Sequence, residues 1–305
     1  MTRVALAPEP DEYAVDAVRR GGGTVVGLDE SPEGLVWTRP AQWSEIGPAL
    51  DRAGTVRWVQ LPFAGVEEVV AAGVLRRGVT WACAKGVYSE PVAEHALALA
   101  LAALRSVPQY ARATSWTGQA AVTLYDAPVV VLGGGGITEA LVRLLGPFRA
   151  QVTAVRRDAG RPVPGAGRTV GLGDLDDVLG DALVVVLALA LTRETEQVVD
   201  ARRLARMRRD AVLVNVARGR HVDTDALVDV LRDGGIGAAA LDVTDPEPLP
   251  DGHPLWDLPT CLVTPHTANP WSTAQPLLAR RIEDNVRRAS AGQPLVGLVD
   301  VDAGY

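Results

Sequence analysis

Short apolar runs alternate along most of the chain with longer segments whose apolar residues recur at helical spacing. The runs after residue 128 are continuously apolar, and each is followed by polar residues. Such runs, separated by crossover-length segments, are typical of a parallel sheet covered by helices on both faces. The run 187–191 is predicted to continue the third strand. The predicted strands of this doubly wound sheet are 129–132, 151–155, 184–187, 211–215, 238–241 and 261–263.

The part of the chain before residue 62 repeats this alternation on a smaller scale and predicts a second, small α/β unit. Its predicted strands and helices are 4–7, 11–20, 24–26, 35–37, 44–53 and 56–61.

Two further helices are predicted. In the segment 89–104 apolar residues alternate as in a strand, but Ser89 as a cap, a proline near the start and abundant alanine favour a buried helix. A last helix, 272–290, is expected to return to the first part of the chain. Because 305 residues are too many for one small core, two domains are expected, 1–95 with 272–305 and 96–271.

A glycine loop lies between the first strand of the larger sheet and the helix that follows it. Gly133 and Gly135 occupy the first two positions of the pattern G-x-G-x-x-G, and Thr138 occupies the third. In this pattern the first glycine permits a tight turn, the second lets the backbone approach a pyrophosphate, and the helix start supplies N–H groups. The loop predicts a dinucleotide site. A glycine-rich turn that binds no ligand is the alternative.

Two arginines, Arg156 and Arg157, follow the next strand, where an adenosine ribose is expected. An acidic residue there would accept a hydrogen bond from a free 2′-hydroxyl, whereas arginine accommodates a 2′-phosphate. NADP(H) is therefore predicted as the preferred cofactor, with NAD(H) possible. The alternative is that both arginines belong to a solvated strand end.

Composition and charge remove several function classes. A net charge of −7 leaves no basic footprint for nucleic acid. No apolar run reaches the roughly 20 residues that cross a bilayer, and no leader-like segment opens the chain, so a cytoplasmic protein is expected. Cys83 and Cys261 lie in apolar segments and are expected to be reduced and buried, and no cluster of cysteine and histidine has metal-ligand spacing.

Three segments that follow strands of the larger sheet carry candidate catalytic residues. These residues are Arg218, Glu247, which lies between two prolines, and His266. Because ligands of doubly wound sheets bind beyond the carboxyl ends of the strands, Arg218, Asp242 and His266 are expected around one crevice. For each residue alone, a solvated arginine or a structural histidine is the usual alternative.

Together these segments resemble the D-isomer-specific 2-hydroxyacid dehydrogenases, and in particular NADPH-preferring glyoxylate/hydroxypyruvate reductases. The resemblance covers nearly the whole chain and implies a Rossmann-type cofactor domain, a smaller flavodoxin-like α/β substrate domain and a homodimer.

From its residues alone, the segment Phe63–Glu67 is equally a plain turn or a loop whose N–H groups face an anion. The segments that match family signatures are Asn215–Gly219, Asp242–Pro248, Thr264–His266, Phe63–Glu67 (the substrate-carboxylate loop) and Ala93–Leu97 (the interdomain helix).

The resemblance also implies residue roles, with Arg218 binding substrate, His266 donating a proton and Glu247 pairing with His266. Reduction of a 2-keto acid needs a fork for carboxylate or carbonyl oxygen and a proton donor with a pKa near neutrality, which these residue types supply. The implied substrate-binding residues are Ala64, Gly65, Arg218 and His266. The cofactor-binding residues expected from the glycine loop, the two arginines and the resemblance are Gly133, Gly135, Gly136, Ile137, Arg156, Arg157, Val216, Ala217, Arg218, Asp242, His266 and Ala268.

The predicted function is NADPH-dependent reduction of a small 2-keto acid such as glyoxylate or hydroxypyruvate. Two alternatives stay open, a non-catalytic dinucleotide-sensing scaffold and a formate-dehydrogenase-like oxidase, which would be expected to lack Glu247. Two residues depart from the family pattern. Thr138 replaces a glycine, which concerns how closely the helix approaches the sheet, and Ala190 stands where proline is common, which suggests a looser edge near the adenine.

Overall fold

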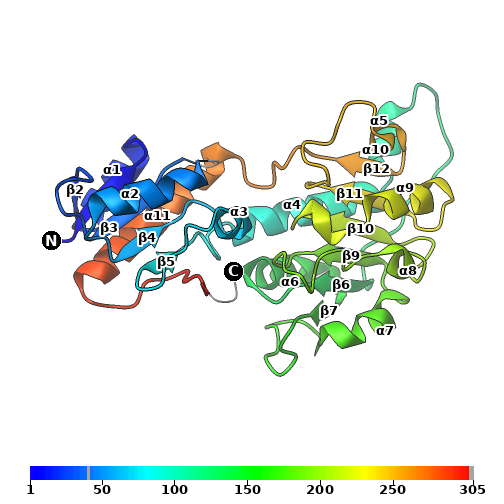
Figure 1. The fold of residues 1–305 in the computed structure, drawn as a ribbon. Helices are drawn as coiled ribbons and strands as arrows, with labels where there is room; N and C mark the ends of the chain where they lie inside the picture. The colour runs from blue at the N-terminus through cyan, green and yellow to red at the C-terminus, as the bar shows by residue number, and fades with distance from the viewer. Residues whose placement is uncertain (40–41, 302–305) are drawn as a thin grey trace. The chain divides into compact units, whose positions relative to one another are not determined.

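The computed structural model describes residues 1–39 and 42–301 and divides into two compact units. Unit 1 comprises Met1–Tyr88 with Pro270–Tyr305, so both ends of the chain, blue and red in Figure 1, belong to it, and unit 2 comprises Ser89–Asn269. The expected boundaries at 95/96 and 271/272 fall inside α4 (Ser89–Leu104) and α11 (Trp271–Ser290). Each of these is one continuous helix and belongs whole to one unit.

Unit 1 is built on a five-stranded parallel sheet of order β2-β1-β3-β4-β5. This order is that of flavodoxin-like folds and agrees with the small α/β domain expected from the sequence. Its strands are β1 (Arg3–Ala7), β2 (Thr24–Val26), β3 (Gly34–Trp37), β4 (Trp58–Gln60) and β5 (Thr80–Ala82). Its other helices are α1 (Glu12–Arg20), η1 (Trp43–Glu45), α2 (Ile46–Ala53) and α3 (Glu67–Ala71).

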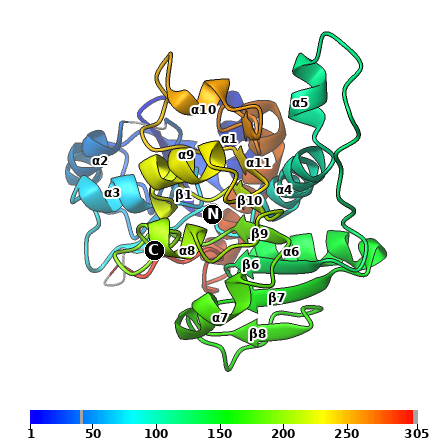
Figure 2. The same cartoon turned by 90° about the vertical axis from the view of Figure 1, so that its right-hand side faces the viewer.

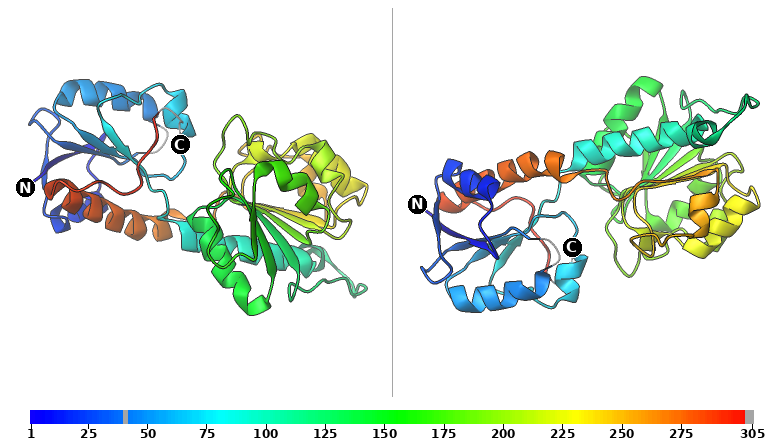
Figure 3. Two further views of the ribbon diagram at one scale, coloured as in Figure 1. Left: turned by 90° about the horizontal axis from the view of Figure 1, so that it is seen from below. Right: turned by 90° about the horizontal axis from the view of Figure 1, so that it is seen from above.

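Helices cover both faces of this sheet because successive side chains of a strand point to opposite faces. On β1, Val4 and Leu6 pack in the cluster with α1 and α11, whereas Ala5 and Ala7 pack in the cluster with α2 and α3. Figure 3 shows the sheet of unit 1 between these two helical layers.

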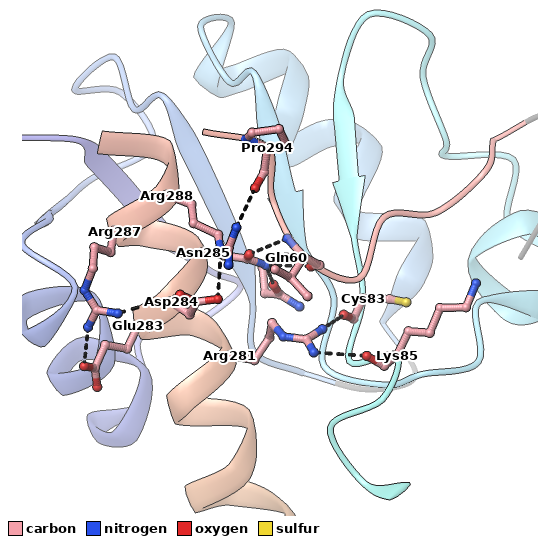
Figure 4. A network of polar contacts seen from close by, with 11 residues as sticks. Gln60, Cys83, Lys85, Arg281, Glu283, Asp284, Asn285, Arg287, Arg288 and Pro294 are labelled. Carbon is pink, nitrogen blue, oxygen red and sulfur yellow. Dashed lines mark hydrogen bonds and ion pairs between the residues drawn. The ribbon is translucent and has the colours of Figure 1, made fainter. Parts of the chain in front are cut away.

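The segment after α11 is fixed to the edge of the same sheet. The fully buried Asn285 accepts a hydrogen bond from the Val296 N–H (2.8 Å) and donates to the Val296 carbonyl (3.0 Å) and to Gln60 Oε1 (2.7 Å), as Figure 4 shows in part. The N–H of Cys83 then donates to the Gly297 carbonyl. The C-terminal segment is thereby part of unit 1.

Unit 2 contains a seven-stranded parallel sheet of order β12-β11-β10-β9-β6-β7-β8. Counted within the unit and read from β8, this is the order 3-2-1-4-5-6-7 of a Rossmann-type doubly wound sheet, so the predicted fold class is confirmed. The strands are β6 (Pro128–Leu132), β7 (Gln151–Val155), β8 (Arg168–Val170), β9 (Val184–Leu187), β10 (Val212–Asn215), β11 (Ala238–Leu241) and β12 (Cys261–Val263). The helices besides α4 are α5 (Val107–Arg112), α6 (Gly136–Leu145), η2 (Gly146–Phe148), η3 (Leu172–Asp174), α7 (Leu175–Leu179), α8 (Ala201–Leu204), η4 (Gly219–His221), α9 (Thr224–Arg232) and α10 (Pro254–Asp257).

The central strands of unit 2, β6, β9, β10 and β11, are buried on both faces. Leu175, Leu204 and Leu227, from α7, α8 and α9, share one core cluster with alternate strand residues such as Leu132 and Leu213. The helices α4 and α6 pack together (Figure 2), and α4 also contacts β10 and β11. This two-sided burial accounts for the continuously apolar strand sequences.

The predicted extension of the third strand through 188–191 is wrong. β9 ends at Leu187, where it pairs with Leu132 on one side and Asn215 on the other. Both neighbouring strands end at the same level, so residues beyond Leu187 have no strand to pair with. Two three-residue strands, β5 and β8, have no counterpart among the predicted strands, because their sequences, TWA and RTV, are interrupted by polar residues.

Cys83 and Cys261 are buried and unbridged, as the sequence predicted. Within residues 1–39 and 42–301, no helix is both long and apolar enough to cross a membrane, and no three histidine, cysteine or acidic side chains form a metal-binding group.

Candidate active site

The loop after β10 places Arg218 at the carboxyl end of the sheet. The amide of Asn215, the last residue of β10, accepts a hydrogen bond from the Ala217 N–H (3.0 Å) and donates one to the Arg218 carbonyl (2.8 Å). Arg218 Nη1 donates to the Ala217 carbonyl at 2.7 Å, and the side chain is half-buried. A single buried amide therefore sets the turn that carries the guanidinium.

Gly219 allows this loop to approach the loop after β11. A Cβ at Gly219 would lie 1.9 Å from the Thr244 carbonyl oxygen, so no other residue fits without a shift of the backbone. The Arg-Gly pair thus joins two roles, because the arginine supplies the charge and the glycine brings the loops of β10 and β11 together.

Asp242, directly after β11, is buried and fastens the loop after β12. Its carboxylate accepts hydrogen bonds from the Thr264 hydroxyl (2.6 Å) and from the N–H groups of Thr267 (2.9 Å) and Ala268 (3.0 Å). His95 Nε2, from α4, lies 3.2 Å from the same carboxylate. Burial by itself would raise the pKa of Asp242, but these hydrogen bonds outweigh it and lower the pKa to about 2.

His266 and Glu247 form a direct pair. His266 Nδ1 lies 2.6 Å from Glu247 Oε1, and the two side chains are 52% and 39% exposed, so the pair is reachable from solvent. The hydrogen bond to Glu247 raises the pKa of His266, while burial and the charge of Arg218 oppose this shift. Burial by itself would raise the pKa of Glu247, but the hydrogen bond and charge of His266, with smaller contributions from the Thr244 N–H and Arg218, lower it.

These three catalytic candidates follow neighbouring strands, since β10, β11 and β12 are adjacent in the sheet. The charge of Arg218 lowers the pKa of both Glu247 and His266, so the three side chains lie in the same region of unit 2. A fork, a carboxylate and an imidazole in one place are able to hold an anionic substrate and transfer a proton.

The glycine loop has the geometry of an anion-binding turn. Gly133 has φ +130°, and a Cβ there would lie 2.1 Å from the Ala188 carbonyl oxygen, so glycine is required. Gly135 precedes the first turn of α6, and a Cβ there would meet no atom within 4 Å, which leaves the backbone open to a ligand. Gly136 and Ile137 begin the helix, whose first N–H groups have no partners within it. Thr138 is fully buried and occupies the inner side of the turn.

Arg156 follows β7 and lies against the glycine loop. A Cβ at Gly134 would lie 2.8 Å from both Cδ and Nε of Arg156, so the missing side chain of Gly134 makes room for the arginine. Arg156 Nη1 donates to the Arg161 carbonyl at 3.0 Å. Arg157, the next residue, is exposed.

Ala190 lies in a turn that is held by the hydroxyl group of Thr195. The Thr195 hydroxyl donates to the Ala190 carbonyl (2.7 Å) and accepts from the Thr192 N–H (2.8 Å). The hydroxyl of Thr195 therefore orders this turn, which the alanine at position 190 had suggested would be looser.

In unit 1, the segment Phe63–Glu67 connects β4 to α3. The Phe63 carbonyl accepts from the Ala84 N–H (2.9 Å), and the Ala64 carbonyl accepts from the Cys83 thiol (3.6 Å). Among the described residues, the N–H groups of Ala64 and Gly65 donate no hydrogen bond.

Arg281 of α11 braces the chain beside this loop. It donates to the carbonyls of Cys83 (2.9 Å) and Lys85 (3.0 Å), as Figure 4 shows. The loop Phe63–Glu67 is therefore fixed by contacts with the residues that follow β5, and Arg281 in turn fixes those residues.

The remaining cofactor-binding candidates also lie in unit 2. Val216 and Ala217 are buried in the loop after β10, and Ala268 is half-buried beside Asp242. No individual role for His95, Thr264 or Thr195 was expected from the sequence. The partners of His95 and Thr264 come from other elements, and those of Thr195 lie in its own turn, so no spacing rule predicts these contacts.

A Rossmann-type sheet with a glycine turn after its first strand, a second α/β unit and a histidine–carboxylate pair defines a two-unit nucleotide-dependent oxidoreductase. The profile of the D-isomer specific 2-hydroxyacid dehydrogenase NAD binding domain matches residues 97–268, which is more than half of the chain. The chain belongs to the D-isomer-specific 2-hydroxyacid dehydrogenase family, as its sequence predicted.

Relatives and solved structures agree with this assignment. An uncharacterized protein in the proB 3′ region of Corynebacterium melassecola is 41% identical over 84% of this chain and 86% of its own. Glycerate dehydrogenase of Methylorubrum extorquens is 32% identical over 75% of this chain and 74% of its own. The structure of a D-isomer specific 2-hydroxyacid dehydrogenase from Xanthobacter autotrophicus, in complex with NADPH and MES, has a TM-score of 0.86 at 29% identity and covers 100% of this chain and 99% of its own.

Proposed function

We propose that this protein is an NADPH-dependent reductase of small 2-keto acids such as glyoxylate or hydroxypyruvate. The observation that carries the proposal is the 2.6 Å contact between His266 Nδ1 and Glu247 Oε1, with Arg218 on the neighbouring loop. Unit 2 is the cofactor domain in this proposal, and unit 1 is the substrate domain.

The glycine loop of unit 2 fits the cofactor. The open backbone at Gly135 and the free N–H groups at the start of α6, which is ten residues long, suit a pyrophosphate. Thr138 does not interfere, because it is fully buried on the inner side of the turn. Val216, Ala217 and Ala268 would contribute backbone near the same edge of the sheet.

Arg156 and Arg157 support a preference for NADPH. The side chain of Arg156 lies beside the glycine loop, where a guanidinium would pair with a 2′-phosphate. The NADPH complex of the Xanthobacter autotrophicus protein supports the same choice. NAD(H) remains a possible second cofactor.

When bound, the cofactor supplies the hydride that the keto carbon accepts. The chain's own residues then hold the substrate and deliver the proton. Arg218 would hold the carboxylate or carbonyl oxygen in its fork, and the N–H groups of Ala64 and Gly65 would bind the carboxylate. Because Nδ1 of His266 is engaged by Glu247, Nε2 is the atom that releases the proton to the developing alkoxide.

Glu247 separates this function from a formate-dehydrogenase-like oxidase. Oxidation of formate needs no proton donor, whereas reduction of a keto acid requires an imidazolium, which a hydrogen-bonded carboxylate stabilises. The name of the Methylorubrum extorquens relative supports the substrate class, because oxidation of glycerate at its 2-hydroxyl gives hydroxypyruvate.

A panel of 2-keto acids tests the proposal. The panel contains glyoxylate, hydroxypyruvate, pyruvate, phenylpyruvate and a branched-chain keto acid, each assayed by the loss of NADPH absorbance and again with NADH. We expect turnover with at least one small keto acid and a higher kcat/KM with NADPH. If no compound is reduced while NADPH still binds, a non-catalytic dinucleotide-sensing scaffold replaces the reductase.

We also propose that the protein is a homodimer. The segment 107–125, here called the arm, exposes several large apolar side chains, and such clusters mark interfaces. Trp116 is 99% exposed, while the Tyr110 hydroxyl accepts from the Ala120 N–H (2.7 Å) and gives the arm a defined shape. The other exposed apolar residues of the arm are Val107, Tyr110, Val122 and Tyr125.

A cytoplasmic location of the protein stays a prediction from the sequence.

A further inference from the structure

The carboxylate of Asp242 is the centre of a buried network in unit 2. It is 2% exposed, and four donors surround it, namely the Thr264 hydroxyl, the N–H groups of Thr267 and Ala268, and Nε2 of His95. A buried carboxylate is costly unless donors satisfy it. Each donor therefore contributes to keeping this group charged and in place.

The geometry assigns the hydrogen atom on His95. The Thr264 hydroxyl has one hydrogen, which it donates to Asp242 Oδ1 at 2.6 Å, so its oxygen is left only as an acceptor. His95 Nε2 lies 3.1 Å from this oxygen and 3.2 Å from Asp242 Oδ1. Both atoms accept, so His95 must carry a hydrogen on Nε2 and donate it toward them.

Asp242 in turn fixes the backbone that carries His266. The His266 N–H donates to the Asp242 carbonyl (2.8 Å), and the Asp242 carboxylate holds the two N–H groups that follow His266 at positions 267 and 268. His266 itself has φ +49°, a left-handed conformation that a residue with a side chain adopts only when its surroundings hold it. The direction of its imidazole depends on these bonds.

We propose that His95 is a positioning residue for proton transfer, because its hydrogen bond orients Asp242 and Thr264 and so holds His266 against Glu247. The proposal rests on the proposed reductase function only for its kinetic readout. The charged groups that act on His266 are Glu247, Arg218 and Asp242, and His95 reaches it through Asp242.

Three variants at position 95 distinguish the effect of losing the hydrogen-bond donor from the effect of losing side-chain volume. His95→Ala removes both, His95→Phe keeps a ring without a donor, and His95→Gln keeps an N–H that can reach the same oxygens. The matched control is Val92→Ala, which removes apolar volume from a buried position of the same helix without touching Asp242.

We expect the Ala and Phe variants to lose roughly tenfold in kcat and to move the falling limb of the pH–rate profile to lower pH. The reason is that a loosened His266 loses part of its contact with Glu247. The dissociation constant of NADPH should change less than kcat. His95→Gln should restore most of the rate, and Val92→Ala should lower the melting temperature without moving the profile.

Titration of the His266 imidazole by NMR gives a readout that does not need activity. The chain has four histidines, so the resonance can be assigned with a His266→Gln variant. We expect the midpoint to fall in His95→Ala and His95→Phe and to be near the wild-type value in His95→Gln.

An unchanged His266 midpoint in both the Ala and the Phe variants overturns the role of His95, even if the enzyme is active. A lowered midpoint in a protein that reduces no keto acid instead supports the role of His95 and rejects the reductase. The two proposals therefore fail in different ways.

Discussion

His266 Nδ1 lies 2.6 Å from Glu247 Oε1, and the two side chains come from loops that follow the adjacent strands β12 and β11. The hydrogen bond raises the pKa of His266, so the imidazolium persists to a higher pH than in an isolated histidine. The rate of keto-acid reduction should be highest at low pH and should fall as the pH rises through this raised pKa. In Glu247→Gln the falling limb should move to lower pH.

The sizes of these effects follow from the role of each residue. His266→Ala should lower kcat by about a hundred- to ten-thousand-fold, and Glu247→Gln by less. Because the two groups act as one unit, the double variant should be scarcely slower than His266→Ala. Steady-state kinetics from pH 5 to 9 measure kcat and the pH–rate profile of each variant. A profile that Glu247→Gln leaves in place would show that the proton comes from another group.

Asp242 should make the protein sensitive to acid. Its hydrogen bonds lower the folded-state pKa from 3.8 to about 2, so its contribution to stability is full above pH 4 and is lost as the pH falls toward 2. A difference of this size corresponds to on the order of 2 kcal/mol. Urea unfolding of wild type and Asp242→Asn should therefore show a gap in unfolding free energy that narrows between pH 4 and pH 2. Asp251→Asn, at an exposed turn residue, is the control and should show no such gap.

Gly134 should contribute to cofactor choice through Arg156. A methyl group at Gly134 would displace the Arg156 side chain from beside the glycine loop, and the flexible arginine would move rather than the backbone. We expect Arg156→Ala to lower the ratio of kcat/KM with NADPH to that with NADH by roughly ten- to a hundred-fold, and Gly134→Ala to lower it by a smaller factor. Gly173→Ala, where a Cβ meets no atom within 4 Å, should leave the ratio unchanged. The role of Gly134 is rejected if only Arg156→Ala changes the ratio.

Gly219 should be among the least replaceable residues of unit 2. A Cβ there would lie 1.9 Å from the Thr244 carbonyl oxygen, so Gly219→Ala must push the loops of β10 and β11 apart. We expect a loss of roughly 3 kcal/mol or more in unfolding free energy together with a large fall in activity. Gly146→Ala, at the end of α6 with open space around it, is the control. Near-native stability of Gly219→Ala would mean that the close contact between the loops after β10 and β11 is not needed for stability.

The arm should be the contact between two copies of the chain. Trp116 is 99% exposed, and a tryptophan in such a place commonly carries much of the energy of an interface. Trp116→Glu should weaken the dimer by about thirtyfold or more, measured by sedimentation over a range of concentrations. Trp256→Glu, on α10 outside the arm, should leave the dimer intact. A wild-type protein that is monomeric at all concentrations rules the homodimer out.

The catalytic candidates could be predicted from the sequence because each follows a strand with a strong apolar pattern. Once β10, β11 and β12 are recognised, the rule that parallel strands end at one edge brings Arg218, Asp242 and His266 together, whereas the role of Glu247 was expected only from the family resemblance. Element boundaries were also accessible, since β7, β11 and β12 have the predicted ends.

Other features depend on contacts that no pattern encodes. The end of β9 at Leu187 follows from where its neighbours end, and the apolar residues after it give the opposite impression. One partner of Asp242 is His95, 147 positions earlier in the chain, on a helix that the sequence marked as buried and as the interdomain helix, with no sign of this contact. The place of Arg156 depends on the absence of a side chain at Gly134.

The order of the seven strands has a consequence for engineering. The groups proposed to transfer the proton follow β11 and β12, the arginine proposed to pair with the cofactor follows β7, and three strands, β10, β9 and β6, lie between β11 and β7. At about 4.8 Å per strand, β12 and β7 are separated by roughly 24 Å. Substitutions that far apart act additively on free energy. Cofactor preference and acid–base chemistry are thus separable traits, and a library at Gly134 and Arg156 can be evolved for NADH without re-optimising the pair at positions 247 and 266.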